Sequence, residues 1–287
     1  MHYECFGCDI RQMKKISAFL HLSIEKEAQL TMLADNYLQA CDMTKTNPEI
    51  MQEIWSLIKD VIGTDNPYQE IKAYYNQLVL SMSDSLYAKI RKSDHPLEDA
   101  LKLAIAGNLI DFAAKHTFDE RTFEETVRHL SETQLAINHS NKLFHAIENS
   151  RTLLYLGDNC GEIVLDKLFI VLLKEYYPHL QVFYGVRGKP IVNDVTVEDA
   201  KQVQMHEAAE VLSNGDGALG TVLHRTSAKF QACFQDADTV LCKGQGNYEG
   251  LSNCHRKNLF FLFMAKCDLI AKPLGVNKMS IVCIRKE

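Results

Sequence analysis

The stretch between residues 151 and 166 constrains the fold of this chain more than any other. Residues 152–156 comprise a threonine, three leucines and a tyrosine, and this short apolar run predicts a buried strand. Residues 157–161 supply a turn, and the apolar spacing over residues 163–177 predicts an amphipathic helix. An aspartate and an asparagine directly follow the strand, at the edge where open α/β sheets bind ligands. On this stretch alone, either residue could equally be only a helix cap.

The rest of the chain after residue 151 repeats this alternation. Further strands are expected at residues 180–186, 210–212, 239–242, 259–265 and 280–284, with helices at residues 198–200 and 220–234. Strands alternating with helices imply right-handed crossovers and a mainly parallel sheet. Residues 150–287 are therefore predicted to form an α/β domain, a three-layer α/β/α sandwich with a Rossmann-like sheet.

Residues 1–149 show a helical pattern almost throughout. Between residues 20 and 38, apolar side chains recur at intervals of three and four, and Pro48 stands where another helix would begin. Further helices are expected at residues 69–83, 97–112 and 123–138, and around residues 143–147. Because no convincing strand pattern is present, we predict an all-helical N-terminal domain that ends at residue 149.

Composition and charge argue against several classes of protein. Of the 287 residues, 46% are hydrophobic and 24% are charged, which is typical of a globular protein with a substantial core. The net charge of −6, without a basic stripe, argues against nucleic acid as a partner. We expect no membrane span and no signal peptide, because no apolar run has the required length or position. Nine cysteines in mostly apolar or mixed contexts favour a reducing compartment, so we expect a cytoplasmic protein of undetermined oligomeric state.

The chain opens with a CxxC pair, Cys5 and Cys8. Such a pair can be half of a metal site, a redox dithiol or two unrelated thiols. No second CxxC follows, so the sequence does not spell out a four-cysteine zinc site. The role of the pair stays open at this point.

Residues 106–112 form an unusual part of a predicted helix. Asn108 and Asp111 are three residues apart and share a helix face, next to Gly107, which is unfavourable within a helix. This helix could pack closely against a neighbour at the glycine, with the polar pair at its rim. Alternatively, it could present both polar side chains to a cleft beside the second domain.

Polar groups of one kind follow the predicted strands. Oxygen donors follow two of them, with Asp158 and Asn159 after the first and Asn193 and Asp194 after the second. The later strand ends carry glycines and lysines, namely Gly215, Gly217, Lys243, Gly244, Gly246 and Lys266. Carboxylate and amide oxygens suit Mg²⁺ or Mn²⁺, and glycine loops and lysines suit a phosphate group. The sequence therefore predicts a metal and phosphate site at this edge of the sheet.

Four segments occur in an order that resembles a known family. They are residues 157–164 (Gly-Asp-Asn-Cys-Gly-Glu-Ile-Val), 189–196 (Lys-Pro-Ile-Val-Asn-Asp-Val-Thr), 243–249 (Lys-Gly-Gln-Gly-Asn-Tyr-Glu) and 265–267 (Ala-Lys-Cys). Residues 66–68 (Asn-Pro-Tyr) with Lys72 and Asn76, and residues 106–111, extend the match over nearly the whole chain. The chain resembles the metal-dependent damage-control phosphatases, long catalogued as a domain of unknown function. The N-terminal CxxC is similar to that of the mainly prokaryotic branch.

The resemblance implies an activity and a set of site residues. It implies a divalent metal ion held by Asp158, Asn159 and Asp194, and hydrolysis of phosphate monoesters of small metabolites, such as sugar phosphates or damaged phosphometabolites. Lys266 would contact the phosphate. The substrate-binding residues would be Asn108, Asp111, Glu162, Ser213, Gly215, Lys243, Gly244 and Asn247.

Two positions depart from the family pattern. Leu219 stands where proline is expected, which makes the loop at residues 213–220 the weakest part of the match. Cys160 stands where alanine or glycine is usual, directly beside the expected metal ligands.

The expected mechanism is an in-line attack by metal-activated water without a phosphoenzyme. Asp158, Asn159, Asp194 and Lys266 would be the catalytic residues. Asp158 as a covalent nucleophile is the competing mechanism, although a carboxylate that binds a metal is a poorer nucleophile. The metal could be Mg²⁺, Mn²⁺, Co²⁺ or Ni²⁺, since this set of oxygen donors accepts all four.

Three other classes of protein remain possible at this stage. An S-adenosylmethionine-dependent methyltransferase would also place an acidic strand end in a doubly wound sheet, but the first loop here lacks a glycine-rich nucleotide pattern. A non-catalytic protein would bind sugar phosphates without turnover. A redox protein would depend on Cys5 and not on Asp158.

Overall fold

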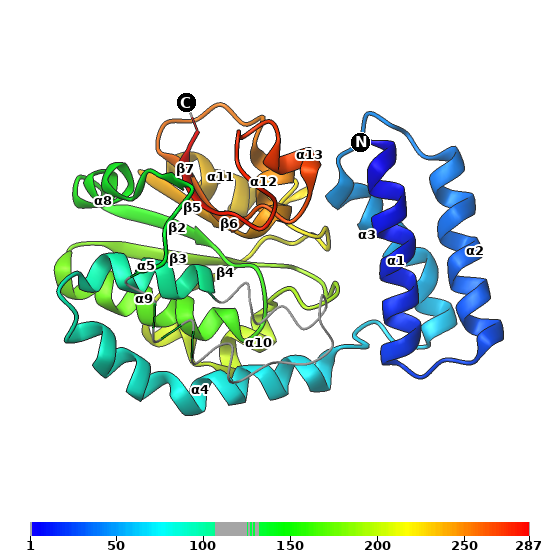
Figure 1. Ribbon diagram of the computed structural model, residues 1–287, viewed down its shortest axis with the longest axis horizontal. Coiled ribbons are helices and arrows are strands. Elements are labelled where there is room, and N and C mark those ends of the chain that lie inside the picture. The colour runs from blue at the N-terminus through cyan, green and yellow to red at the C-terminus, as the bar shows by residue number, and fades with distance from the viewer. Residues whose placement is uncertain (1, 107–124, 126, 128, 130–131, 287) are drawn as a thin grey trace.

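A computed structural model describes residues 2–106, 125, 127, 129 and 132–286. Its centre is a seven-stranded sheet with the order β1-β7-β6-β5-β2-β3-β4 (Figure 1). The strands are β1 (Ile137–Asn138), β2 (Thr152–Leu156), β3 (Gln181–Val186), β4 (Glu210–Ser213), β5 (Thr239–Lys243), β6 (Leu259–Met264) and β7 (Ile281–Arg285). All neighbouring strands pair in parallel except β6 and β7, which are antiparallel. The expected α/β fold with a mainly parallel sheet is confirmed.

Strand β2 lies at the point where the strand order reverses. From β2 the chain builds outward through β3 to β4, and then returns to add β5 and β6 on the other side of β2. The loops that leave β2 and β5 therefore diverge to opposite sides of the sheet. In open α/β sheets the crevice between two such loops is the usual ligand site.

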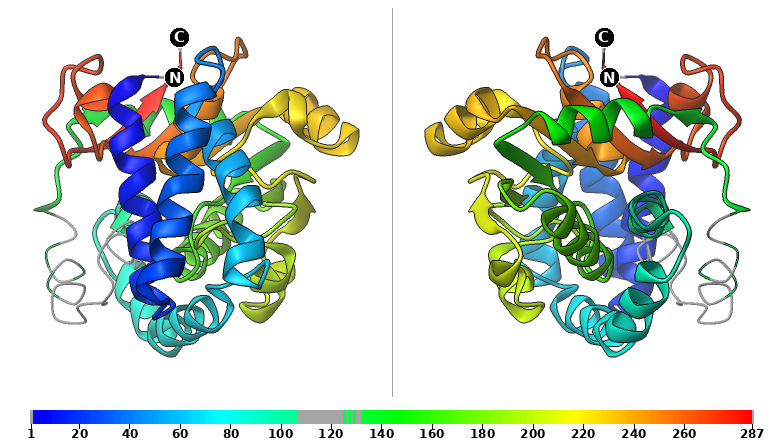
Figure 2. Two further views of the ribbon diagram at one scale, coloured as in Figure 1. Left: turned by 90° about the vertical axis from the view of Figure 1, so that its right-hand side faces the viewer. Right: turned by 90° about the vertical axis from the view of Figure 1, so that its left-hand side faces the viewer.

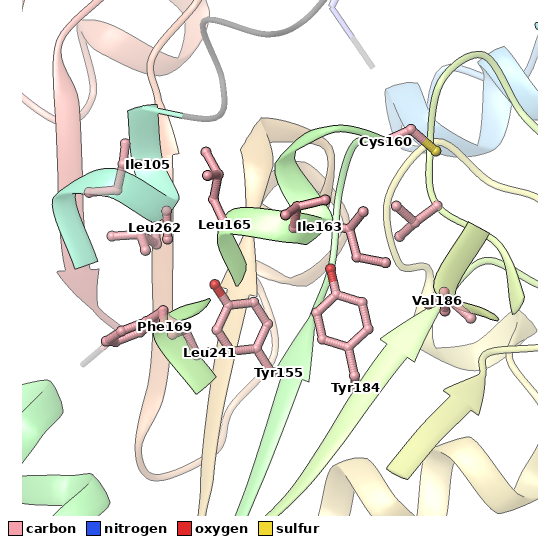
Figure 3. Packing of buried hydrophobic residues seen from close by; sticks show 14 of the residues in the cluster. Ile105, Tyr155, Cys160, Ile163, Leu165, Phe169, Tyr184, Val186, Leu241 and Leu262 are labelled. Atoms are coloured by element: carbon pink, nitrogen blue, oxygen red, sulfur yellow. The ribbon is translucent and has the colours of Figure 1, made fainter. Parts of the chain in front are cut away.

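Helices cover both faces of the sheet because its strands are apolar on both sides. Along β2, Leu153 and Tyr155 belong to one buried cluster and Leu154 and Leu156 to the other. The first cluster includes residues of α5 (Pro96–Ala106) and α9 (Glu162–Tyr176), and Figure 3 shows the Tyr155 ring beside Phe169 of α9. The second cluster includes residues of α11 (Ala228–Asp236), α12 (Gly244–Leu251) and α13 (Asp268–Ala271). The alternation along a single strand thus accounts for the three layers.

The N-terminal helices are α1 (Tyr3–Phe19), α2 (Ile24–Ala40), α3 (Asn47–Ile62) and α4 (Gln69–Arg91). Helices α1 to α3 pack in sequence order and stand at one side of the sheet (Figures 1 and 2). A reciprocal pair of hydrogen bonds between Thr46 and Glu49 begins α3, where Pro48 occupies the first turn. Helix α4 and the following α5 lie instead along α9. The expected domain boundary at residue 149 stays a prediction.

The remaining helices are α8 (Ser140–Glu148) and α10 (Val197–Gln202), with the short 3-10 helices η3 (Met205–Glu207) and η4 (Leu223–Arg225). Within the described residues, no helix is long and apolar enough to cross a membrane.

Three elements differ from the sequence expectations. Residues 137 and 138 form the two-residue strand β1 in a region expected to be helical, and a strand of this length leaves no periodic signal. Helix α11 begins at Ala228 and not at residue 220, because Gly220 has a φ of 110° and Ser227 caps the helix. Helix α12 occupies the expected glycine loop after β5, so tertiary packing overrides the low helix propensity of glycine there.

Candidate active site

A cavity of about 260 Å³ lies at the carboxyl end of the sheet, between the strand-end loops and the helices α1 and α3. The strand-end loops and α12 contribute Asp158, Asn159, Val192, Asn193, Asp194, Leu219, Gln245, Gly246, Glu249 and Lys266. The N-terminal helices contribute Cys8, Asp9, Gln12, Lys15, Asn47 and Met51. A larger depression of about 730 Å³ is lined by Gln181 and Glu210, the first residues of β3 and β4. It therefore lies at the opposite end of the strands from the first cavity.

The loops that follow β2 and β3 are fastened to each other. The amide of Val195 donates to the carbonyl of Asp158 at 2.8 Å, and the amide of Cys160 donates to the carbonyl of Asn193 at 3.0 Å. Asn159 and Asp194 form an isolated antiparallel bridge between these bonds. The structure therefore places the three expected metal ligands, Asp158, Asn159 and Asp194, side by side in one cavity.

Arg187, which was not among the predicted site residues, is a buried cation beneath the three expected ligands. Its Nε donates to Oδ2 of Asp194 at 2.6 Å, and Nη2 lies 3.8 Å from Oδ1 of Asp158. Nη1 donates to the hydroxyl of Thr221 at 3.3 Å. The guanidinium thus holds Asp194 by a hydrogen bond and faces Asp158 as an ion pair, while its Nη2 donates to the carbonyl of Gly157 at 3.4 Å. Its position directly after β3 was the available sequence signal.

The electrostatics of the site favour an additional cation. Burial raises the pKa of Asp158 well above its usual range, and the carboxylates of Asp194 and Glu162 raise it further. Burial also raises the pKa of Asp194, although Arg187 opposes this shift. Two buried carboxylates that both resist ionisation gain from a positive charge placed between them.

Asn159 is held by the carboxylates on either side of it. Its amide nitrogen donates to Asp158 Oδ2 at 2.8 Å and to Glu162 Oε2 at 3.2 Å. This assignment directs the amide nitrogen to the carboxylates and leaves the amide oxygen as the atom suited to a metal. Glu162, the first residue of α9, is therefore a positioning group.

Lys243 and Asp166 form a charged layer below Glu162. The Lys243 ammonium contacts Glu162, lies 2.7 Å from Asp166 Oδ1 and donates to the carbonyl of Ala104 at 2.9 Å. Asp166 also accepts the hydroxyls of Tyr155 at 2.6 Å and Tyr184 at 2.8 Å. Figure 3 shows both tyrosine hydroxyls at the same end of their stacked rings. Through Glu162, which accepts a hydrogen bond from Asn159, this layer links the buried tyrosines to the Asn159 side chain.

Asn247 connects the ends of β2 and β5. Its amide nitrogen donates to the carbonyls of Gly157 at 3.1 Å and Lys243 at 2.6 Å, and its amide oxygen accepts the hydroxyl of Thr221 at 2.8 Å. The side chain is fully buried. It therefore fixes the spacing of the two loops at the crevice.

The expected site residues thus fall into separate groups. Asp158, Asn159, Asp194 and Lys266 line the cavity. Glu162, Lys243 and Asn247 are fully buried and support the lining from behind. Ser213 is the last residue of β4 and Gly215 lies in the turn that follows, where the Ser213 hydroxyl accepts a hydrogen bond from the Gly215 amide. Leu219 and Gly246 border the cavity on that side. Gly107, Asn108 and Asp111 lie outside the described residues.

Gly244 brings β5 against Asp158. It has a φ of 78°, and a Cβ atom there would lie 1.9 Å from Asp158 Oδ2. Substituting Gly244→Ala is expected to displace the carboxylate and, in the phosphatase that the sequence predicts, to lower kcat/KM about a hundredfold, the scale of a 1 Å misplacement. The Gly275→Ala variant is the matched control, because Gly275 has a φ of 68° but no atom within 4 Å of the added Cβ. Equal activity losses in both variants would show that backbone strain, and not contact with Asp158, is responsible.

Of the CxxC pair, Cys8 lies at the rim of the same cavity. Cys8 is exposed there and its sulfur accepts from Nη2 of Arg11 at 2.9 Å. Burial, with a contribution from Glu249, raises the pKa of Cys5 to about 11, which is the opposite of what a reactive thiolate requires. Among the described residues, no group of three His, Cys, Asp or Glu side chains is placed to hold a metal. The donor set at the strand ends is different because it includes the amide of Asn159.

The oxygen donors of Asp158, Asn159 and Asp194 fit a hard divalent cation. They are two carboxylates and one amide, without sulfur or imidazole, in a cavity where the carboxylates resist ionisation without further positive charge. Three protein ligands would leave coordination positions for substrate and water.

Comparison with known proteins identifies relatives that match all or most of the chain. The family model for the damage-control phosphatase ARMT1-like domain matches residues 1–282. A damage-control phosphatase of Pyrococcus horikoshii is 31% identical over 292 residues, which cover 100% of this chain and 98% of that protein. One from Archaeoglobus fulgidus is 30% identical over 253 residues, covering 88% of this chain and 85% of its own. The crystal structure of a DUF89 family protein from Pyrococcus horikoshii has a TM-score of 0.90 at 30% identity, covering 100% of this chain and 99% of that one.

Proposed function

The chain belongs to the damage-control phosphatase ARMT1-like family, and we propose that it is a metal-dependent phosphatase acting on phosphate monoesters of small metabolites. Sugar phosphates and damaged phosphometabolites are the proposed substrates. The main support for the proposal is that Asp158, Asn159, Asp194 and Lys266 line one cavity. This cavity lies at the point where the strand order reverses. The cavity of about 260 Å³ suits a small metabolite better than a large adenosyl cofactor.

We propose that Asp158, Asn159 and Asp194 hold Mg²⁺, Mn²⁺, Co²⁺ or Ni²⁺. When bound, such an ion supplies Lewis-acid polarisation of the phosphoryl group and a nucleophile from water near neutral pH. Arg187 keeps both carboxylates directed at the cavity, and Glu162 turns the Asn159 amide. These three ligands would therefore be set in place before the ion arrives.

Lys266 and the first turn of α12 are proposed to bind the phosphate oxygens. Lys266 lines the cavity. Burial has the larger effect and raises the pKa of Asp158, whereas the positive charge of Lys266 lowers it. Gln245 and Gly246 of the first turn of α12 border the same space, and a helix N-terminus favours an anion. Positive groups on one side and oxygen ligands on the other would hold the phosphoryl group between them.

Water is the proposed nucleophile, and Asp158 is the alternative. Oδ2 of Asp158 accepts from Asn159 and Oδ1 lies 3.8 Å from Arg187, so both carboxylate oxygens are already engaged. A carboxylate held in this way is poorly suited to in-line attack. Trapping a phospho-aspartate at residue 158 would replace the water mechanism.

Phosphate release after metal depletion tests the proposed function. The protein is stripped with a chelator, reloaded separately with each of the four metals, and given a panel of sugar phosphates and phenyl phosphate. We expect turnover only after reloading, and the panel ranks the metals and substrates. Tight binding of sugar phosphates without turnover in any metal would instead identify a non-catalytic binding protein.

A further inference from the structure

Three polar side chains from the N-terminal helices border the cavity with buried atoms that lack a hydrogen-bond partner. They are Oδ2 of Asp9 and Nε2 of Gln12, both on α1, and Oδ1 of Asn47, the first residue of α3. Buried polar atoms are nearly always hydrogen-bonded in folded proteins, so three such atoms around one cavity need an explanation. They lie across the cavity from the strand-end loops, and the mechanism above uses none of them.

We propose that Asp9, Gln12 and Asn47 bind the hydroxyl groups of the alcohol that carries the phosphate, so that α1 and α3 select the substrate. This inference rests on the proposed phosphatase function, because it assigns the second half of the same cavity. The phosphoryl group lies against Lys266 and the strand-end loops, and the leaving alcohol extends toward the N-terminal helices.

The chemistry of the three atoms favours hydroxyl groups as ligands. Asp9 and Asn47 offer acceptor oxygens, whereas Gln12 offers an amide donor. A hydroxyl group both donates and accepts, so neighbouring hydroxyls of one molecule can satisfy all three atoms. An apolar leaving group would satisfy none of them and would keep the polar atoms buried without partners, which is unfavourable.

Asp9 is the strongest member of this set. It is only 1% exposed, although it is a carboxylate on a helix at the edge of the molecule. Burial raises its pKa to about 7, and the carboxylate of Glu249 on the opposite wall contributes to the shift. A buried carboxyl group facing another carboxylate favours a ligand that donates hydrogen bonds, as hydroxyls do.

Asn47 supplies a link between the two walls. Its amide nitrogen lies 3.5 Å from Glu249 Oε2, while its amide oxygen lacks a partner. Glu249 in turn accepts from the Gln245 side chain at 2.6 Å, and Gln245 Oε1 accepts the amide of Lys266 at 2.8 Å. The proposed alcohol site is therefore continuous with the proposed phosphate site.

Substrate-dependent kinetics of Asp9→Ala and Gln12→Ala test the proposal. The substrates are phenyl phosphate, which has no hydroxyls, and whichever of glucose 6-phosphate, ribose 5-phosphate and glycerol 3-phosphate the wild type uses best. Each variant is expected to raise KM for the hydroxylated substrate about tenfold with little change in kcat, as the loss of one hydrogen bond to a bound ligand predicts. For phenyl phosphate both parameters should stay within about twofold. The matched control is Glu4→Ala, because Glu4 is an exposed carboxylate of α1 outside the cavity. This variant should leave KM and kcat unchanged for both substrates.

Calorimetric binding of the same three hydroxylated phosphates to chelator-treated protein separates this inference from the proposed function. The two variants should weaken binding by about the same factor as they raise KM. If the wild type hydrolyses no phosphate ester, the phosphatase proposal fails and the binding comparison alone decides the role of Asp9 and Gln12. Equal losses on phenyl phosphate and on the hydroxylated substrate would show a structural role and overturn the inference. So would unchanged binding in both variants, or a wild type that binds none of the three.

Discussion

Substituting Asp158→Asn is expected to abolish phosphate release and, at the same time, to stabilise the metal-free protein. The amide would keep the size of the side chain but lose the charge that the proposed cation requires, so we expect a loss in kcat of at least about a thousandfold, equivalent to about 4 kcal/mol. Burial and the neighbouring carboxylates of Asp194 and Glu162 raise the pKa of Asp158, which means that its charge is unfavourable in the folded state. Removing the charge should therefore raise the free energy of unfolding by about 1–2 kcal/mol at pH 7.

The size of the stability effect depends on pH. The folded-state pKa of Asp158 lies above the unfolded value, so its protonation favours folding at low pH and this contribution is lost as the pH rises. The gain from Asp158→Asn should accordingly be larger at pH 7 than at pH 4, measured by denaturant unfolding in the presence of a chelator. Asp268→Asn is the control, because the Asp268 side chain is 61% exposed and should affect neither activity nor stability. Retained activity in Asp158→Asn would remove Asp158 from the catalytic set.

Substituting Lys243→Met is expected to cause the largest loss of stability. Burial opposes the charge of Lys243, but Asp166 and Glu162 outweigh this effect and keep its pKa above the usual range. All three side chains are completely buried. Methionine would fill a similar volume and leave two carboxylates close together without a cation, which costs about 3–5 kcal/mol of unfolding free energy for a broken buried ion pair.

Denaturant unfolding of three variants separates the charge effect from the packing effect. Lys272→Met serves as the control, since the Lys272 side chain is 80% exposed and lies 3.9 Å from Asp268. The double variant Lys243→Met with Glu162→Gln should recover part of the lost stability, because only one carboxylate then remains without its cation. No recovery, together with a small effect of Lys243→Met alone, would mean that the ammonium does not hold this layer together.

The sequence predicts those parts of the site that belong to a local pattern. Residues 152–156 were expected as a strand, and β2 has these bounds, because a short apolar run with a turn behind it leaves few alternatives. The positions of Asp158 and Asp194 at one edge then follow from the parallel sheet, in which the carboxyl ends of strands meet. Family resemblance supplied the expected roles, and the structure supplied the mutual geometry.

The parts that escaped prediction depend on contacts between distant segments. Arg187 contacts Asp158 and Asp194 only because two loops meet, and no spacing along the chain encodes that contact. Helix α12 forms although it contains three glycines. A Cβ at Gly250 would lie 2.1 Å from the carbonyl oxygen of Thr221, so close packing explains a glycine that propensity alone disfavours. The contribution of α1 to the cavity was likewise hidden, because the side chain of Asp9 gives no sign in the sequence that it is buried.

The most direct test of the account is the position of a bound metal ion in crystals of the active protein. Crystals equilibrated with Mn²⁺ are measured above the manganese absorption edge, and an anomalous difference map locates the ion. We expect a peak bounded by the side-chain oxygens of Asp158, Asn159 and Asp194. A peak elsewhere, such as beside Cys5 and Cys8, with no density between those three side chains in protein that releases phosphate under the same conditions, would contradict it.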